Sequence, residues 1–337
     1  MSDLPDGLID FLAEARWDDA EIDAIPGDAS FRRYFRLRRK DGSGAMLMFA
    51  PPPHEDPLPF LNVADWLNAH HMRAPEIYHS APAQGWVLLE DFGNDRMRDW
   101  LDLNPGHEQA AYEASIDALV DLHLLPAGPF APYSMDEYLR EVGLFTEWYA
   151  PAIGLAVDSE SYLAAWREVL TPVAATQSPG VTVLRDYHAE NIMLLHGQPG
   201  APQGLIDFQD ALVGHPAYDL VSLLQDARRD VDPAFAGAMC DYYRKVRLTR
   251  DPSFAGASND RFLADYAVLG AQRNAKIVGI FTRLFKRDGK ARYLDMIPRV
   301  WALLEADLRH PALEPVARWF GVNIPEELRR AGGGTIA

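Results

Sequence analysis

Residues 182–194 read TVLRDYHAENIML, and this stretch decides how the rest of the chain is interpreted. An apolar run stops before Asp186, a few polar and small residues follow, and apolar residues resume after Asn191. Short apolar runs bounded by polar residues are typical of buried strands, so the pattern predicts a strand, a tight loop and a second strand. Asp is common in turns, so the loop is either an ordinary turn or part of a reactive site.

A second polar position follows the next apolar run. Fifteen residues after Asn191 the run ends in Ile206, and Asp207 comes directly after it. Asp and Asn supply the hard oxygen ligands that Mg²⁺ accepts beside phosphate oxygens. A further carboxylate that takes the proton of an attacking hydroxyl completes a site for phosphoryl transfer. We therefore predict that Asn191 and Asp207 bind Mg²⁺ and that Asp186 is the catalytic base.

Length and charge limit the classes of protein that fit. The chain has 337 residues, enough for two lobes that each have a core. Its formal net charge of −17 repels nucleic acid and anionic lipid, so neither is an expected partner. A nucleotide would be repelled as well, so any phosphate site needs local cations or a metal ion. Most of the acidic residues are expected to serve solubility.

Cysteine content and hydropathy favour a cytoplasmic protein. Cys240 is the single cysteine, which excludes an intramolecular disulfide and fits a reducing compartment. The first residues, MSDLPDGLIDFLAEARW, lack the pattern of a signal peptide. No run of about 18 apolar residues is present, so no membrane span is expected. Nothing in the sequence indicates an obligate protein partner.

The pattern of apolar residues changes near residue 93. Residues 1–92 are expected to form a strand-rich lobe, because Phe31–Arg38 alternates with period two and a turn signal follows at Asp41 and Gly42. The other expected elements of this lobe are helices at 4–16 and 60–70 and strands at 45–49 and 86–90. Residues 93–337 show mostly helical spacing, with short strands at 181–184 and 205–206. The helices are expected at 108–125, 135–149, 161–170, 218–227, 233–247, 260–285 and 291–309. The tail 331–337 is expected to be disordered.

The motif around Asp186 resembles the catalytic loop of protein-kinase-like enzymes. Asp186 and Asn191 match the loop Asp and Asn, and Asp207 matches the metal-binding Asp of the DFG motif. The spacing Asp-x-His-x-x-Asn is similar to the aminoglycoside phosphotransferase and choline kinase branch. In that branch the residue matching Asp219, in HPAYDL, braces the catalytic loop. The resemblance implies an α+β, two-lobed fold in which residues 1–92 bind nucleotide and residues 93–337 carry the catalytic and substrate-binding groups.

Longer segments resemble one group within this branch, the anomeric N-acetylmuramate/N-acetylglucosamine kinases of cell-wall recycling. The matching segments are ASFRRYF (29–35), FAPPP (49–53), RDYHAEN (185–191), LIDFQDALVGHPAYDL (205–220) and GAQRNAKIVGIFTRLFKRDGKARYL (270–294). The resemblance covers nearly the whole chain. It implies an ATP-dependent and Mg²⁺-dependent kinase that phosphorylates the anomeric hydroxyl of a small amino sugar.

Two departures from the kinase pattern affect the nucleotide site. Leu184 stands where kinases usually have a His, and the strand AMLMFAP (45–51) lacks the Lys that pairs the α- and β-phosphates. Arg32 or Arg33 is the expected replacement, and the alternative is a solvated strand face. The glycine-rich loop is reduced to PGDASF (26–31). The remaining expected nucleotide contacts are the backbone N–H groups of Ala29, Ser30 and Phe31, and a hinge at Glu90, Asp91 and Phe92 that reads adenine.

Several polar residues have both a functional and a structural interpretation. Gln209 and Asp210 either bind sugar hydroxyls or cap a helix. Arg273 and Lys276 lie in an apolar helical stretch where cations need partners, and we expect them to bind substrate. The remaining expectations are structural: His188 is a hydrogen-bonding residue, Glu190, Glu55 and Asp56 face solvent, and Phe145, Trp148 and Tyr149 belong to the core.

Two alternatives remain open from the sequence. An aminoglycoside or choline-type substrate fits the same fold, and a cationic substrate would suit the acidic charge. A nucleotide-binding pseudokinase fits the missing strand Lys, but such a protein has no chemical need for Asp186, Asn191 and Asp207 together. The sequence also leaves open which amino sugar is preferred.

Overall fold

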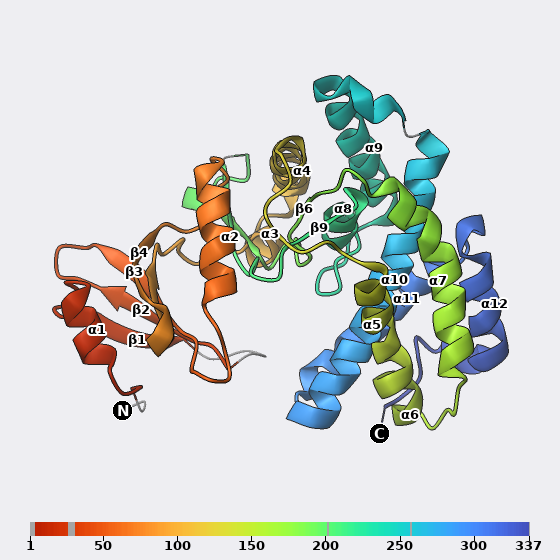
Figure 1. Cartoon of the computed structure of the whole chain (residues 1–337), viewed down its shortest axis with the longest axis horizontal. Coiled ribbons are helices and arrows are strands. Elements are labelled where there is room, and N and C mark those ends of the chain that lie inside the picture. The colour runs from red at the N-terminus through yellow and green to blue at the C-terminus, as the bar shows by residue number, and fades with distance from the viewer. Residues whose placement is uncertain (1–3, 26–30, 201, 257, 337) are drawn as a thin grey trace. The chain divides into compact units, whose positions relative to one another are not determined.

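A computed structural model describes residues 4–25, 31–200, 202–256 and 258–336, and Figure 1 traces its helices and strands. The chain divides into two compact units, and each unit is built from two stretches of sequence. The first unit comprises Met1–Ala114 and Asn191–Asp210, and the second comprises Ser115–Glu190 and Ala211–Ala337. Residues 182–194 are therefore divided between the two units: Asp186 belongs to the second unit and Asn191 to the first.

The first unit is built on an antiparallel sheet with strand order β1-β2-β3-β5-β4. Its strands are β1 (Glu21–Ile25), β2 (Arg33–Arg38), β3 (Gly44–Phe49), β4 (Ile77–Ala81) and β5 (Trp86–Leu89). The strands at 31–38, 45–49 and 86–90 were predicted, whereas β1 and β4 were not. Both unpredicted strands lie at the edges of the sheet and lack a regular alternation of buried and exposed residues.

The β2–β3 hairpin explains why period two was readable in this lobe. Phe35 pairs with Leu47 and Leu37 with Ala45, and all four side chains are buried on one face of the sheet. Alternating apolar residues on paired strands share a face, so register and burial reinforce each other. Helix α1 (Leu8–Glu14) packs its apolar residues into the same cluster. The predicted hairpin and N-terminal helix are both confirmed.

Two helices and a second hairpin complete the first unit. The helices are α2 (Leu58–Ala69) and α3 (Met97–Leu103), and the hairpin consists of β7 (Ile192–Leu194) and β8 (Gln203–Leu205). Backbone bonds attach this hairpin to earlier segments: the Leu194 N–H donates to the Asp95 carbonyl at 2.8 Å, and the Leu205 N–H donates to the Arg73 carbonyl at 2.8 Å. Helix α4 (Glu108–Leu124) continues from the first unit into the second.

The second unit is mostly helical. Its main elements are α5 (Met135–Leu144), α6 (Ala150–Ala152), α7 (Ser159–Thr176), α8 (Ala217–Leu224), α9 (Pro233–Arg250), α10 (Asn259–Asp288), α11 (Ile297–Asp307), α12 (Glu314–Asn323) and α13 (Glu326–Arg330), with the strand pair β6 (Val181–Val183) and β9 (Leu212–Gly214).

Helix α10 is the long central helix of this unit and packs against α5, α8 and α11 (Figure 1). A Cβ added at Gly279 would lie 2.4 Å from the backbone of Leu144, so only glycine allows α10 and the end of α5 to approach this closely.

Three expectations about the helical part need correction. The helix predicted at 135–149 ends in a π-helical turn over Phe145–Tyr149, and the helix predicted at 291–309 begins as a 3₁₀ segment over Ala291–Met296. The tail expected to be disordered is packed instead. The Tyr149 hydroxyl donates to the Gly333 carbonyl, and Ile336 is buried. Local composition missed this because the partners of the tail come from distant parts of the sequence.

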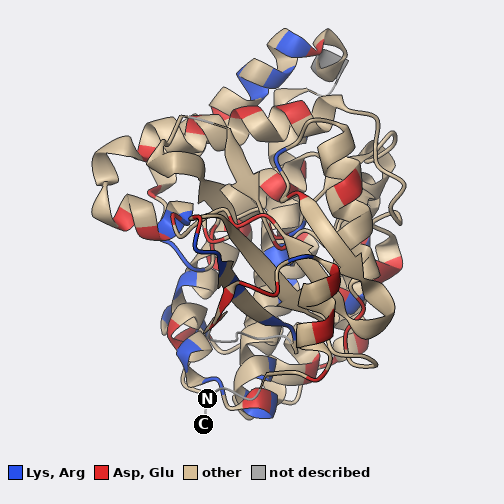
Figure 2. Ribbon diagram, turned by 90° about the vertical axis from the view of Figure 1, so that its left-hand side faces the viewer, with Lys and Arg blue, Asp and Glu red and all other residues tan. Residues whose placement is uncertain are grey.

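Figure 2 shows acidic and basic residues interspersed along helices and loops. In the part of the chain that the structure describes, no helix is long and apolar enough to cross a membrane.

Candidate active site

The loop that carries Asp186 is held from below by helix α8. Both carboxylate oxygens of Asp219 accept backbone N–H groups, from Leu184 at 2.6 Å and from Arg185 at 2.8 Å. Burial raises the pKa of Asp219 to about 7, although the two donors oppose that rise. Arg185 has a φ of +72°, a conformation uncommon for residues other than glycine. Asp219 therefore supports an unusual backbone conformation directly before Asp186.

The side chain of Arg185 extends into a buried charge cluster centred on Glu141 of α5. Glu141 is 1% exposed and accepts hydrogen bonds from Arg185, from Tyr133 and, at 3.0 Å, from Gln272. The Lys276 ammonium lies 2.7 Å from the same carboxylate. Burial alone would raise the pKa of Glu141, but Lys276 and Arg185 outweigh burial and lower it to about 2. Glu141 is thus a buried anion that neutralises two cations.

Asp186 lies partly exposed beside another buried cation, Arg273. Its side chain is 44% exposed, and its carboxylate lies 3.9 Å from the guanidinium of Arg273, which is 2% exposed. Burial raises the pKa of Asp186, but the positive charges of Lys276, Arg273 and Arg228 reverse the effect and lower the pKa to about 2. The carboxylate is therefore ionised at any working pH, and it is accessible enough to accept a hydrogen bond from an incoming hydroxyl.

The polar residues after Asp186 hold the loop in shape. The guanidinium of Arg228 lies 3.0 Å from His188 Nε2 and 3.0 Å from Glu190. A guanidinium only donates, so His188 Nε2 is the acceptor and the ring is neutral. Burial and then Arg228 lower the pKa of His188 to about 4, in agreement with this tautomer. Glu190 does not simply face solvent, as expected from the sequence, because it pairs with Arg228.

Asn191 and Asp207 meet at the base of the β7–β8 hairpin in the first unit. The Asn191 carbonyl accepts the N–H of Ile206 at 3.1 Å, and this backbone pairing brings the two side chains together. The Asn191 amide donates to Asp207 at 3.4 Å, and the Asp207 side chain is 49% exposed. Asp207 itself has a φ of +60°.

This pair fits the coordination chemistry of Mg²⁺. The two residues offer an amide and an accessible carboxylate, and Mg²⁺ commonly takes one or two protein oxygens and completes its shell with water and phosphate. No group of three or more His, Cys, Asp or Glu side chains among the described residues could hold a metal ion.

Two further side chains, those of Gln209 and Arg32, lie next to Asp207. The Gln209 amide donates to its carboxylate at 3.0 Å, and the Arg32 guanidinium lies 4.0 Å from it. The Gln209 carbonyl oxygen is buried and has no hydrogen-bond partner among the described residues. Asp210 is exposed. An acceptor without a partner next to Asp207 gives Gln209 the chemistry needed to bind a hydroxyl group.

The side chains expected at the hinge are held by neighbouring arginines. Arg73 makes a two-point ion pair with Glu90, including one hydrogen bond of 2.7 Å, and Arg36 donates to Asp91 at 3.0 Å. The Glu90 N–H donates to the Glu76 carbonyl at 2.9 Å, so Glu90 can offer adenine its carbonyl but not its N–H. Phe92 lies against Gly204, where an added Cβ would come within 2.6 Å of the ring.

The structure separates the two arginines proposed to replace the missing lysine. Arg32 pairs with Asp207 and, at 3.5 Å, with Glu55, whereas the Arg33 guanidinium lies over the ring of Phe35, 5.2 Å from its centre. The Phe31 N–H donates to Glu55 at 3.3 Å. The predicted contacts at Ala29 and Ser30 lie outside the described residues.

Sequence reasoning missed two carboxylates of this region. Glu141 had a signal: it occupies an apolar helical position between Tyr138 and Phe145, which are both buried. A charged residue on the buried face of a helix needs partners, and the cations of α10 provide them. Glu55 had no such signal and was expected to face solvent, but it contacts Phe31 and Arg32.

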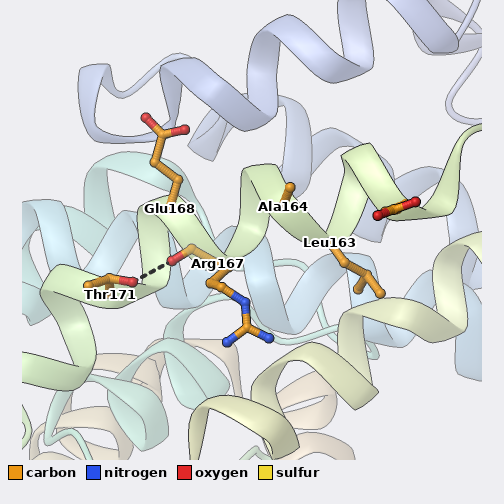
Figure 3. A pocket seen from close by; sticks show the side chains of 6 residues that line it. Leu163, Ala164, Arg167, Glu168 and Thr171 are labelled. Atoms are coloured by element: carbon orange, nitrogen blue, oxygen red, sulfur yellow. Dashed lines mark hydrogen bonds between the residues drawn. The ribbon is translucent and has the colours of Figure 1, made fainter.

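A shallow hollow on the surface lies elsewhere. It runs along α7 and is lined by Glu160, Leu163, Ala164, Arg167, Glu168 and Thr171 (Figure 3). None of these residues belongs to the predicted site, so the hollow contributes nothing to it.

Solved structures with the same fold come from small-molecule kinases. A choline/ethanolamine kinase family protein from Mesorhizobium loti is 15% identical, with a TM-score of 0.59 over 89% of this chain and 92% of that one. The ADP-bound aminoglycoside phosphotransferase APH(2'')-Ib is 14% identical, with a TM-score of 0.57 over 93% and 99% of the two chains. The expected α+β, two-lobed, protein-kinase-like fold is therefore confirmed.

Sequence relatives are closer. The N-acetylmuramate/N-acetylglucosamine kinase of Caulobacter vibrioides is 34% identical over 95% of this chain and 96% of its own. The protein of the same name from Pseudomonas aeruginosa is 37% identical over 90% and 89%. The phosphotransferase enzyme family matches residues 21–257. With its kinase-like fold and relatives that match over nearly their whole length, this chain belongs to the phosphotransferase enzyme family.

Proposed function

We propose that this protein transfers the γ-phosphoryl group of ATP to the anomeric hydroxyl of N-acetylmuramate or N-acetylglucosamine. Relatives that carry this name match nearly the whole chain, which supports the choice of substrate. The observation that carries the mechanism is the state of Asp186, an accessible carboxylate whose pKa is lowered to about 2 by buried cations. A phosphotransferase needs such a permanent acceptor beside the attacking hydroxyl.

Asp186 has the central role in the proposed reaction. Its carboxylate accepts a hydrogen bond from the anomeric hydroxyl and orients an oxygen lone pair toward phosphorus. The proton passes to Asp186 as the new oxygen–phosphorus bond forms and the bond to the leaving ADP oxygen breaks. A carboxylate with so low a pKa is a weak base, so it takes the proton late, when the hydroxyl has become acidic. Most of the rate enhancement then comes from positioning and charge neutralisation.

Asn191 and Asp207 are the residues proposed to hold Mg²⁺, which when bound would neutralise phosphate charge. Either Arg32 or Arg33 is proposed to contact the phosphates together with the backbone N–H groups of Ala29 and Ser30, because the N–H of Phe31 is already bonded to Glu55. The hinge residues Glu90, Asp91 and Phe92 are proposed to bind adenine. The Glu90 carbonyl is the natural acceptor for the adenine amino group, because the Glu90 N–H is already bonded. Residues 1–92 would thus act as the nucleotide-binding lobe and residues 93–337 as the catalytic and substrate-binding lobe.

Gln209 and Asp210 are proposed to bind sugar hydroxyls, since Gln209 presents a buried acceptor without a partner. Arg273 and Lys276 were expected to bind substrate directly. Their burial supports a different contribution, in which they fix the charge and position of Asp186 from below. His188 and Asp219 are proposed to keep their structural roles. We also propose that the reaction takes place in the cytoplasm, where ATP is available.

A substrate panel tests this proposal. The purified protein is incubated with Mg-ATP and, separately, N-acetylmuramate, N-acetylglucosamine, an aminoglycoside and choline, and ADP release is measured. We expect turnover with the amino sugars and a product phosphate that is labile to mild acid, as a sugar 1-phosphate is. Turnover with the cationic compounds alone would contradict the proposal. ATP binding without turnover of any acceptor would favour a pseudokinase.

A further inference from the structure

We propose that Glu55 is a positioning residue that holds Arg32 as the phosphate-binding cation, in place of the lysine that β3 lacks. The proposal rests on the proposed function, because it assumes that ATP binds to the first unit. It extends that function by giving a role to a carboxylate that no motif identifies. It also separates Arg32 from Arg33, which the sequence treats as equivalent.

Glu55 joins two segments of the first unit. One carboxylate oxygen accepts the N–H of Phe31 at 3.3 Å, and the other lies 3.5 Å from Nε of Arg32. The ring of Phe31 also stacks on the ring of His54, with centroids 5.3 Å apart and planes 28° apart. Three contacts therefore tie Phe31 and Arg32 to His54 and Glu55. A surface carboxylate that merely faced solvent would not use both of its oxygens on one neighbouring segment.

Arg32 spans the distance between Glu55 and the proposed metal site. Its Nε faces Glu55, and its Nη1 lies 4.0 Å from Asp207. The Arg32 side chain is 15% exposed and that of Glu55 is 21% exposed. An Arg guanidinium stays protonated at any working pH. The cation is permanent, and contacts at both ends fix its orientation.

The guanidinium is well suited to this task. Its donors form a rigid, planar fork, so fixing Nε through Glu55 also fixes the direction of the two terminal nitrogens. Those nitrogens then face the side of the unit where Asp207 lies, and a phosphate bound there would meet an oriented donor pair. A lysine in the usual place would come from β3, but the sequence of β3 is GAMLMF.

Arg33 has different surroundings from Arg32, in that its guanidinium stacks on an aromatic ring. It is the first residue of β2, whereas Arg32 precedes the strand. Its guanidinium lies over Phe35. Substituting the two arginines is therefore expected to affect nucleotide binding differently. The pairing with Asp207 and Glu55 identifies Arg32 as the proposed phosphate-binding cation.

The test compares binding of ATP and of adenosine by calorimetry, with Mg²⁺ and with EDTA. Arg32→Met should weaken ATP binding about 10- to 100-fold, since a hydrogen bond to a charged group is lost. Glu55→Gln should weaken it roughly 2- to 5-fold, the range of a partly exposed ion pair. Adenosine affinity should stay unchanged in both variants, which also shows that they are folded. Arg32→Lys should recover part of the loss.

Glu55→Gln should have no further effect on the ratio of ATP to adenosine affinity in a protein that already carries Arg32→Met. This non-additivity is the signature of a residue that acts through another. The matched control is the ion pair of Arg38 and Asp23 on the same sheet, 3.9 Å apart with side chains 62% and 66% exposed. Arg38→Met and Asp23→Asn remove the same charges without touching the proposed site, and they should leave the ratio unchanged.

Three outcomes would overturn the inference. Glu55→Gln could equal the Asp23→Asn control, it could change ATP and adenosine affinity equally, or its effect could add fully to that of Arg32→Met. Failure of the proposed function would look different. In that case the unsubstituted protein would not bind ATP, or it would bind ATP and release no ADP with any acceptor.

Discussion

Asp186 and Asp207 are the two carboxylates proposed to act in the reaction, and their surroundings are opposite. Asp186 lies over the buried cations of α10, which lower its pKa to about 2. Asp207 lies at the end of a hairpin among amide groups, with one guanidinium 4.0 Å away. The two side chains are about equally accessible, 44% and 49%. Exposure does not distinguish them, but the charge placed next to each of them does.

This difference matches two different tasks. A group that orients a hydroxyl must remain ionised throughout, and buried cations ensure this without help from the substrate. A metal ligand must accept a dication, and neutral amides beside a carboxylate leave its charge available. Backbone strain accompanies both positions, since Arg185 before Asp186 and Asp207 itself have positive φ. Such strain concentrates at functional sites, where the surrounding structure holds it in place.

The strongest test of this contrast is Asp186→Asn. The amide keeps the size of the side chain but cannot accept the hydroxyl proton. We expect kcat to fall by about 10²- to 10⁴-fold, the usual contribution of a general base. Mg-ATP affinity should stay nearly unchanged, as measured by calorimetry. A variant that loses nucleotide binding to the same degree would show that Asp186 does not have a separate task.

Asp207→Asn should give the opposite profile. Removing the carboxylate should weaken Mg-ATP binding by at least about tenfold, by comparison with the 10- to 100-fold losses caused by substituting residues around a metal site. Affinity for ATP in EDTA should change much less, because Asp207 is proposed to act through Mg²⁺. An equal loss of ATP affinity with and without Mg²⁺ would contradict the proposed metal role of Asp207 and its contrast with Asp186.

A smaller effect on turnover is expected from Glu141→Gln, which removes the anion beneath Arg185. Lys276 and Arg185 would then be buried without their carboxylate, a loss that typically costs about 3–5 kcal/mol of unfolding free energy. The folded-state pKa of about 2 lies below the ordinary value of 4.5. Glu141 therefore stabilises the protein above pH 4.5, and this contribution is lost as the pH falls through 2. The free energies of unfolding of the unsubstituted protein and of Glu141→Gln, measured in urea, should converge as the pH falls from 4.5 to 2.

Asp307 of α11 provides a matched control, because its pKa is shifted in the opposite direction from that of Glu141. It contacts Gln225 at 2.9 Å and Asn274 at 3.2 Å, both amides, and burial raises its pKa to about 8 from 3.8. The folded state keeps a proton that the unfolded chain releases, so this group lowers stability as the pH rises from about 4 to 8. The free energy of unfolding of Asp307→Asn should therefore rise relative to that of the unsubstituted protein over that range, and kcat should be unchanged. If the free energies of unfolding of both proteins varied with pH in the same way, this prediction would be contradicted.

Local sequence was informative wherever a short-range pattern decides the structure. The alternation in Phe31–Arg38 predicted the β2–β3 hairpin because period two and register act over a few residues. The cations at Arg273 and Lys276 stood out because charge in an apolar helix needs a partner. The identity of that partner was not readable: Glu141 is more than 130 residues away in sequence, and only packing of α5 against α10 brings the charges together. Glu55 was missed for the same reason.

The sequence by itself determined the order of the chemistry-bearing residues, from Asp186 to Asn191 to Asp207, and with it the family and the class of reaction. Tertiary structure alone decided the electrostatic state of each group. It determines which carboxylate is surrounded by cations, which arginine pairs with Asp207, and which side chains form hydrogen bonds. The physical reason is that a motif specifies side chains by their spacing along the chain. A pKa depends instead on burial and on charges within a few ångströms, and those are set by residues distant in sequence.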